Sequence, residues 1–245
     1  MPIKFSNLLQ DSWNFIRNQA NFTVTSIALL VLLQIGTFYL FPRPVVSQAD
    51  LQNQDVLALF AQQLTPTIVS ALVSVFLNVL IILNIKSINN GTYQHFAQNL
   101  SESLKAFFPI IGLTIFMVLP MSIGISFGGT VGQAGSLAIM ILPLMATGIY
   151  VFVKLCLVVY AYLLEEPRKG VMETLKFTWG LSRGRMLPLF LFCVLSYMLP
   201  SLLGSVISNI GGELGIILSQ VVGAFISLFV IIFGFRFYQV YRQQA

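Results

Sequence analysis

Six long apolar runs constrain this chain more than any other feature of its sequence. They cover residues 22–41, 67–88, 107–127, 137–164, 187–208 and 214–235. A helix needs about 20 apolar residues to cross the roughly 30 Å of hydrocarbon in a bilayer, and each run reaches that length. Backbone polar groups in lipid must be satisfied within the segment, so helices are the expected spanning form. The sequence therefore predicts an all-α membrane protein with six transmembrane helices, forming one polytopic membrane domain over residues 1–245.

The composition leads to the same class of protein. Only 9% of the residues are charged and 57% are hydrophobic, whereas soluble domains average about 25% charged residues. The formal net charge of +5 raises the question of nucleic-acid binding. However, the basic residues flank the apolar runs, which is the pattern of membrane topology rather than of phosphate tracking. We therefore expect membrane lipid as a partner, with anionic head groups as candidate ligands, and no nucleic acid. The sequence does not identify protein partners.

Lysine and arginine are distributed unevenly between the two sides that six spans define. Of the 13 such residues, Arg43 alone lies on the side away from the termini, and Lys154 lies inside the fourth run. The others share the side of the termini: Lys4, Arg17, Lys86, Lys105, Arg168, Lys169, Lys176, Arg183, Arg185, Arg236 and Arg242. The positive-inside rule then predicts that both termini are cytoplasmic.

A cleaved signal peptide is the alternative interpretation of the first run. Residues 47–49, Ser-Gln-Ala, offer a small-x-small cleavage pattern. The run is longer than the 7–15 residues of a signal h-region, and a polar segment precedes it. We therefore favour a retained transmembrane helix.

Amphipathic segments precede the first, third and fifth runs. In the last of these segments, residues at steps of three and four form one polar stripe of a helix: Lys169, Glu173, Lys176, Gly180 and Arg183. Such helices can lie in the membrane interface, although a helix packed on the bundle would show the same stripe. We predict interfacial helices before the odd-numbered spans. The candidate contacts with lipid or a partner are Lys176, Trp179, Arg183, Arg185, Trp13 and Arg17.

Short sequences recur in the same order along the chain, which predicts internal repeats. "ESLK" at 102–105 resembles "ETLK" at 173–176, and "FMVLPMSIG" at 116–124 resembles "SYMLPSLLG" at 196–204. A weaker first copy is "QDSWNFIRNQANF" at 10–22. Each unit would be an amphipathic segment followed by two spans, and the later unit carries an insertion within "FTWGLSRGRM" at 177–186. Chance matching of Leu- and Pro-rich membrane sequence is the alternative.

Three motifs carry a resemblance to a known family: "DSWNFIRNQ" near the start, "LKFTW" after the fourth run, and the closing "FRFYQVYRQ". Together with the hydropathy layout, they resemble the YciC-type family of uncharacterised bacterial inner-membrane proteins. The resemblance implies a multi-pass protein of the inner membrane of a Gram-negative bacterium. It supplies no catalytic or binding residues.

Polar residues inside the runs are the candidate intramembrane sites. Lys154 is a functional hypothesis by default in a membrane helix, with snorkelling or structural pairing as the alternative. Asn78 and Gln220 each belong to a stripe of small and polar residues on one helix face. Such stripes serve helix packing or, alternatively, a polar path for a solute. Gly124-x-x-x-Gly128, Gly128-x-x-x-Gly132 and Gly211-x-x-x-Gly215 fit close packing, but we expect them to serve turns at the span ends.

Signals for catalysis are weak. His95 is the single histidine, and no cluster at metal-ligand spacing or nucleophile elbow accompanies it. We therefore expect no enzyme activity and name no catalytic, cofactor-binding or metal residues. The leading hypothesis is a non-enzymatic inner-membrane protein of unknown molecular function that supports envelope or lipid-linked processes. The alternative is a transporter or channel for a small solute or lipid.

Overall fold

The computed structural model describes residues 3–40, 56–131, 138–208 and 213–244. Every regular element in these ranges is helical, in the order α1 (Phe5–Asn18), α2 (Ala20–Leu40), α4 (Val56–Asn89), the 3-10 turn η1 (Phe96–Asn99), α5 (Leu100–Val131), α6 (Ala138–Leu155), α7 (Val158–Leu164), α8 (Val171–Leu181), α9 (Met186–Cys193), the π-helical turn η3 (Val194–Met198), α10 (Leu199–Ser208) and α11 (Glu213–Gln244). Arg43 and residues 47–49 lie outside the described residues.

Five segments of the described chain are long and apolar enough to cross a membrane. They are Pro66–Asn89, Phe96–Gly124, Leu142–Leu164, Met186–Gly204 and Leu218–Gln244, and α1 with α2 makes a sixth if the pair, bent by 95°, counts as one span. The predicted all-α membrane fold class is confirmed. Short amphipathic helices stand before α2 and α9 as α1 and α8, whereas η1 runs directly into α5.

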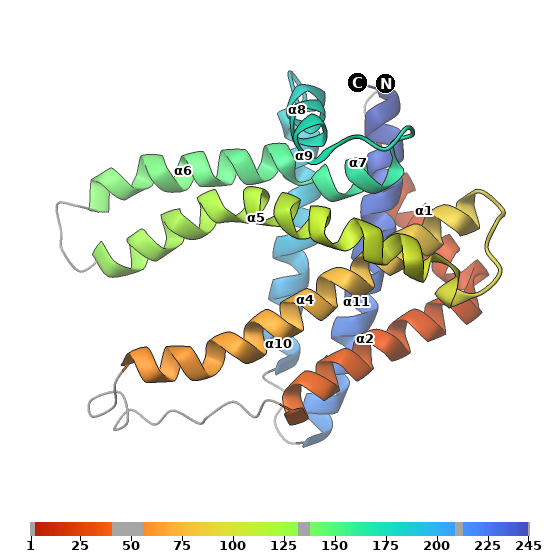
Figure 1. Ribbon diagram of the computed structural model, residues 1–245, viewed down its shortest axis with the longest axis horizontal. Coiled ribbons are helices and arrows are strands. Elements are labelled where there is room, and N and C mark those ends of the chain that lie inside the picture. Colours follow the sequence, from red (N-terminus) through yellow and green to blue (C-terminus); the bar gives the residue numbers. More distant parts are fainter. Residues whose placement is uncertain (1–2, 41–55, 132–137, 209–212, 245) are drawn as a thin grey trace.

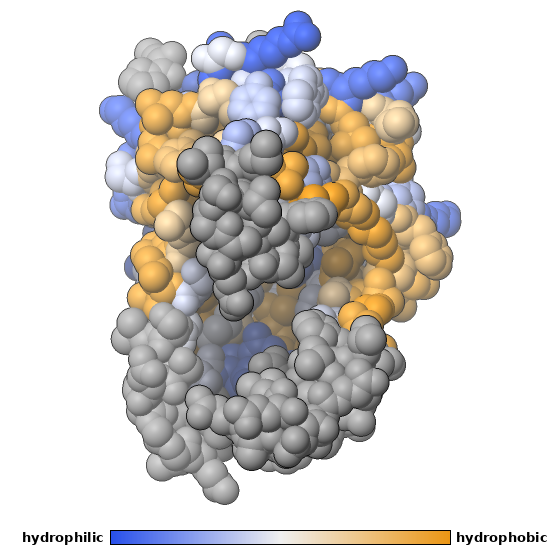
Figure 2. Space-filling model, turned by 90° about the vertical axis from the view of Figure 1, so that its left-hand side faces the viewer, coloured by the Kyte–Doolittle hydropathy of each residue, from blue (hydrophilic) through white to orange (hydrophobic). Residues whose placement is uncertain are grey.

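Both chain termini lie at one end of the molecule, which we call the terminal end (Figure 1). The α7–α8 segment lies at the same end, and the far ends of α2, α4, α5 and α6 extend away from it. Hydrophilic side chains gather at the terminal end, at the top of Figure 2, while apolar side chains cover much of the side below it. This separation of polar and apolar surface is expected for a helical bundle that lies in lipid and exposes one polar end to water.

The buried core lies where α4, α7 and α11 meet the other helices. One cluster includes Ile81, Leu83 and Leu228, and a second surrounds Phe192 and Phe237, whose rings stack at 4.5 Å. Towards the far ends, many large apolar side chains are exposed, as on α4, α5 and α10. Such exposure carries no penalty in lipid, because acyl chains are as apolar as leucine.

Two glycines allow α5 and α6 to approach closely. A Cβ atom on Gly148 would lie 2.7 Å from the Pro120 carbonyl oxygen and 2.8 Å from Met121 Cα. A Cβ on Gly124 would lie 3.1 Å from Met145 Cα. Gly124 therefore serves helix packing and not the turn that we expected. Gly132 and Gly211 lie outside the described residues.

Several predicted runs differ from the helices that form: α4 begins at Val56 and α5 at Leu100, before the runs that start at 67 and 107. The fourth run is divided into α6 and α7 by a break at residues 156–157, and the last helix continues to Gln244, well beyond the apolar run. The continuation of α11 is amphipathic rather than apolar. It buries Tyr238 and Tyr241 at the terminal end, where it meets the segment around α8.

Candidate functional site

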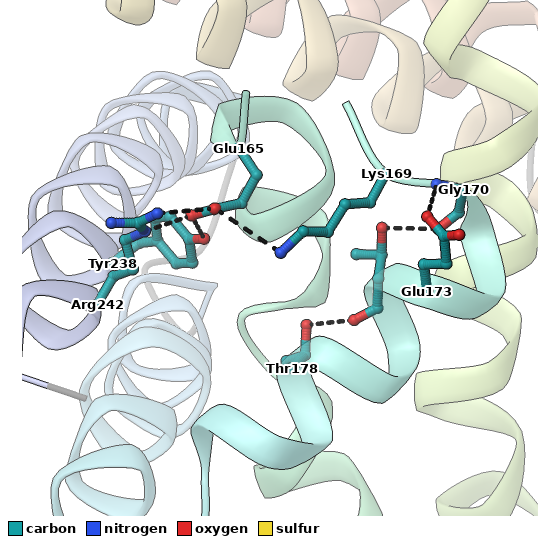
Figure 3. A network of polar contacts seen from close by, with 8 residues as sticks. Glu165, Lys169, Gly170, Glu173, Thr178, Tyr238 and Arg242 are labelled. Atoms are coloured by element: carbon teal, nitrogen blue, oxygen red, sulfur yellow. Dashed lines mark hydrogen bonds and ion pairs between the residues drawn. The ribbon is translucent and has the colours of Figure 1, made fainter. Parts of the chain in front are cut away.

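Helix α8 is fixed at its start by a local cap. Gly170 precedes the helix, and its backbone N–H donates to Glu173 Oε2 at 3.2 Å (Figure 3). This bond satisfies one of the backbone donors that the first turn of a helix leaves without an intrahelical acceptor. The hydroxyls of Thr174 and Thr178 are buried and donate to carbonyls four residues earlier. These threonines leave the opposite face of α8 for Lys176.

A buried carboxylate joins the start of this segment to the last turns of α11 (Figure 3). The Glu165 side chain is 7% exposed. Tyr238 Oη donates to its Oε1 at 2.7 Å, Arg242 donates from Nε to Oε1 at 2.6 Å and from Nη2 to Oε2 at 3.0 Å, and Lys169 Nζ lies 3.9 Å from Oε2. The bidentate bond from Arg242 holds the pKa of Glu165 below its usual value, with the Tyr238 hydroxyl adding to the effect and burial opposing it.

A cavity of about 630 Å³ is lined by Arg242, by Lys176 and by the two arginines of the predicted insertion, Arg183 and Arg185. The lining residues are Lys176, Phe177, Gly180, Leu181, Arg183, Arg185 and Arg242; we call this space the basic cavity. Lys176 comes from α8, and Arg183 and Arg185 come from the turn between α8 and α9, where Gly184 has φ +72°. Tyr241 Oη ties this turn to α11 by donating to the Arg185 carbonyl at 3.1 Å.

Trp179 does not line the basic cavity. It points to α6, where its ring lies 4.6 Å from Lys154 Nζ and 6.1 Å from the Tyr150 ring. Lys154 is 5% exposed, and its ammonium is held by the two aromatic faces in a cation–π arrangement. Lys154 therefore joins α6 to α8, which corresponds to the structural pairing named as one alternative for this residue.

The remaining predicted candidates lie apart from the basic cavity. Trp13 is on α1, 52% exposed, with its ring 6.2 Å from that of Phe225. Arg17 is exposed near the end of α1. Asn78 and Gln220 are half-buried on α4 and α11. The structure thus brings Lys176, Arg183 and Arg185 together at the basic cavity and pairs Trp179 with Lys154, while the other four candidates lie apart.

Sequence reasoning missed Glu165, Tyr238 and Arg242 as parts of one site. We interpreted Arg242 only as a topology signal. The spacing in "FRFYQVYRQ" held one clue, because Tyr238, Tyr241 and Arg242 are three and four residues apart and so share a helix face. The identity of the helix that meets this face is a matter of tertiary packing.

Acidification is expected to destabilise the terminal end through Glu165. Its folded-state pKa is depressed, so the folded protein binds fewer protons than the unfolded chain. The stabilisation is complete above the usual pKa of 4.5 and is lost as the pH falls through the folded-state pKa. Thermal unfolding in detergent from about pH 7 to about pH 3 should show a falling midpoint below the usual pKa. Glu165→Gln should reduce this decline; an unchanged decline would contradict the assignment.

The helices and the polar end define a helical membrane protein with a basic cavity at its terminal end. Compared with known proteins, the chain is similar to an uncharacterised protein of Haemophilus influenzae, with 29% identity over 252 residues that cover 99% of this chain and 100% of the relative. No protein-family model matches the chain, and no solved structure matches it.

Proposed function

We propose that this chain is a multi-pass protein of the bacterial inner membrane, of the YciC type, with both termini in the cytoplasm. The support is the uneven distribution of lysine and arginine along the sequence, together with the hydrophilic terminal end and the apolar side of the molecule (Figure 2). Cytoplasmic connections of inner-membrane proteins carry this excess of positive charge. The basic cavity then opens at the cytoplasmic surface of the membrane.

The proposed role is non-enzymatic support of envelope or lipid-linked processes, through the binding of anionic lipid head groups at the basic cavity. One observation carries this proposal: four cations from α8, the following turn and α11 converge on a single space. Cations that merely set topology need only lie in the same loop. Cations that bind a head group must converge, because Coulomb attraction falls with distance and is screened within about 10 Å.

The proposal predicts that anionic lipid is retained on the protein in mild detergent and depends on the cavity. Lys176→Gln with Arg183→Gln is expected to reduce the retained anionic lipid by about tenfold or more, since each cation near an anionic surface contributes about 1 kcal/mol. The measurement is mass spectrometry of the lipids that co-purify, relative to protein.

The matched control is Lys4→Gln with Lys105→Gln, which removes the same formal charge from exposed positions that do not line the cavity. It should retain most of the lipid. Equal loss in both double variants would reduce the effect to general surface charge and would contradict a site at the cavity.

A further inference from the structure

The charges of the basic cavity are unbalanced, in contrast to those of a second cavity, between the end of α4 and the start of α5. The second cavity, of about 470 Å³, contains Lys86 and two glutamates. Lys86 lies 2.7 Å from Glu166, and Glu102 is paired with Arg168. In the basic cavity, the charge of Arg242 is neutralised by Glu165, which binds it without lining the cavity. No carboxylate of the described residues lines the basic cavity. The basic cavity therefore has a charge of about +3, which comes from Lys176, Arg183 and Arg185.

Three such charges match a group that carries more than one negative charge. A phosphate monoester carries about −1.5 to −2 at neutral pH, whereas the phosphodiester of a common anionic lipid carries only one. Arginine also presents paired N–H donors that fit the oxygens of a terminal phosphate bidentately. Arg183 and Arg185 stand on either side of Gly184 in one turn, which Tyr241 holds against α11.

The surroundings of the cavity indicate that the phosphate belongs to a lipid. Helix α9 begins one residue after Arg185, and its outward side chains Leu187 and Phe190 are 70% and 49% exposed. Phe177 and Leu181 add apolar surface within the cavity. A ligand with its phosphate among the arginines would therefore have an apolar surface along α9 for a hydrocarbon chain.

We propose that the basic cavity binds the terminal phosphate of a phosphomonoester or diphosphate lipid in preference to a singly charged phosphodiester head group. The proposal rests on the proposed function and names its ligand class. Arg183 and Arg185 bind the phosphate oxygens, Lys176 adds charge, and Arg242 is held at the rim by Glu165.

The test compares two lipids on the purified protein in neutral detergent micelles. Phosphatidic acid, a phosphomonoester, is titrated against phosphatidylglycerol, a phosphodiester with the same acyl chains, and bound lipid is counted by native mass spectrometry. The wild-type protein should bind phosphatidic acid at least about fivefold more tightly, the factor expected for one additional charge interaction. The preference should decrease near pH 5, where the monoester keeps about one charge because its second pKa is about 6.

Three variants separate the contributions. Arg183→Gln with Arg185→Gln should abolish the preference, and the Lys4→Gln, Lys105→Gln control should keep it. Arg183→Lys with Arg185→Lys retains the charge but not the bidentate donors, so it should keep only part of the preference. An unchanged melting midpoint in each variant establishes that the fold is intact, since both arginines are exposed.

The outcomes distinguish this inference from the proposed function. Equal binding of the two lipids, lost together in Arg183→Gln with Arg185→Gln, would overturn the inference and leave the proposed function standing. Binding that the cavity variants do not change would overturn both. Inorganic phosphate that competes as strongly as phosphatidic acid would overturn the assignment to a lipid while retaining phosphate recognition.

Discussion

Replacing Gly148 with alanine is expected to separate α5 from α6 and destabilise the protein. The added methyl group would meet backbone atoms of Pro120 and Met121 at 2.7–3.0 Å, and backbone cannot move aside as a flexible side chain can. Overpacking of this kind costs about 1–3 kcal/mol, occasionally more. Thermal unfolding in detergent should show a clearly lower midpoint for Gly148→Ala than for the wild-type protein.

Gly112→Ala provides the control on α5 itself. Nothing lies within 4 Å of a Cβ at that position, and alanine favours a helix over glycine by about 1 kcal/mol. The midpoint should therefore stay the same or rise. If Gly148→Ala behaved like Gly112→Ala, the close approach of α5 and α6 would be wrong.

Replacing Glu165 with alanine is the second large expected effect. Tyr238 is buried, and its hydroxyl would lose its acceptor while Arg242 would lose both of its bonds to the carboxylate. We expect a decrease in the free energy of unfolding of about 1–3 kcal/mol, typical of hydrogen bonds to a charged group. The cost stays below that of a fully buried pair, because Arg242 is 53% exposed and water replaces part of the interaction.

Two companion variants identify the source of the Glu165 effect in the same unfolding measurement. Glu166→Ala removes a neighbouring carboxylate that is 74% exposed and paired with Lys86, so little change is expected. Tyr238→Phe removes one donor and leaves the ion pair, so a smaller loss than for Glu165→Ala is expected. A loss for Glu166→Ala as large as that for Glu165→Ala would contradict the central position of Glu165.

Much of the fold follows from local properties of the sequence. The apolar runs predict helices because length and hydropathy decide whether a segment can span lipid. The polar stripes before the first and fifth runs predict α1 and α8 because side chains three and four residues apart share a face. The break between α6 and α7 carries no such local signal, since the residues around it are as apolar as the spans.

The site was predictable only in part. Lys176, Arg183 and Arg185 are close in sequence, so their convergence follows from the end of one helix and the turn after it. Arg242 joins them only because α11 continues past its apolar run and lies beside α8. Likewise, Trp179 is only three residues from Lys176, so the sequence does not decide which of the two faces the cavity. The rotation of the helices in the bundle decides that Trp179 meets Lys154 instead.

The bond between Glu165 and Arg242 also has a consequence for the order in which parts of the protein fold during synthesis. The two residues are 77 positions apart, so the carboxylate leaves the ribosome several seconds before its partner, at a synthesis rate of about 5–20 residues per second. Until then Glu165 has no guanidinium to compensate its burial, and water must solvate it. We therefore expect the end of α7 to reach its final packing late. The basic cavity is complete only when the last turn of α11 has been synthesised and folded.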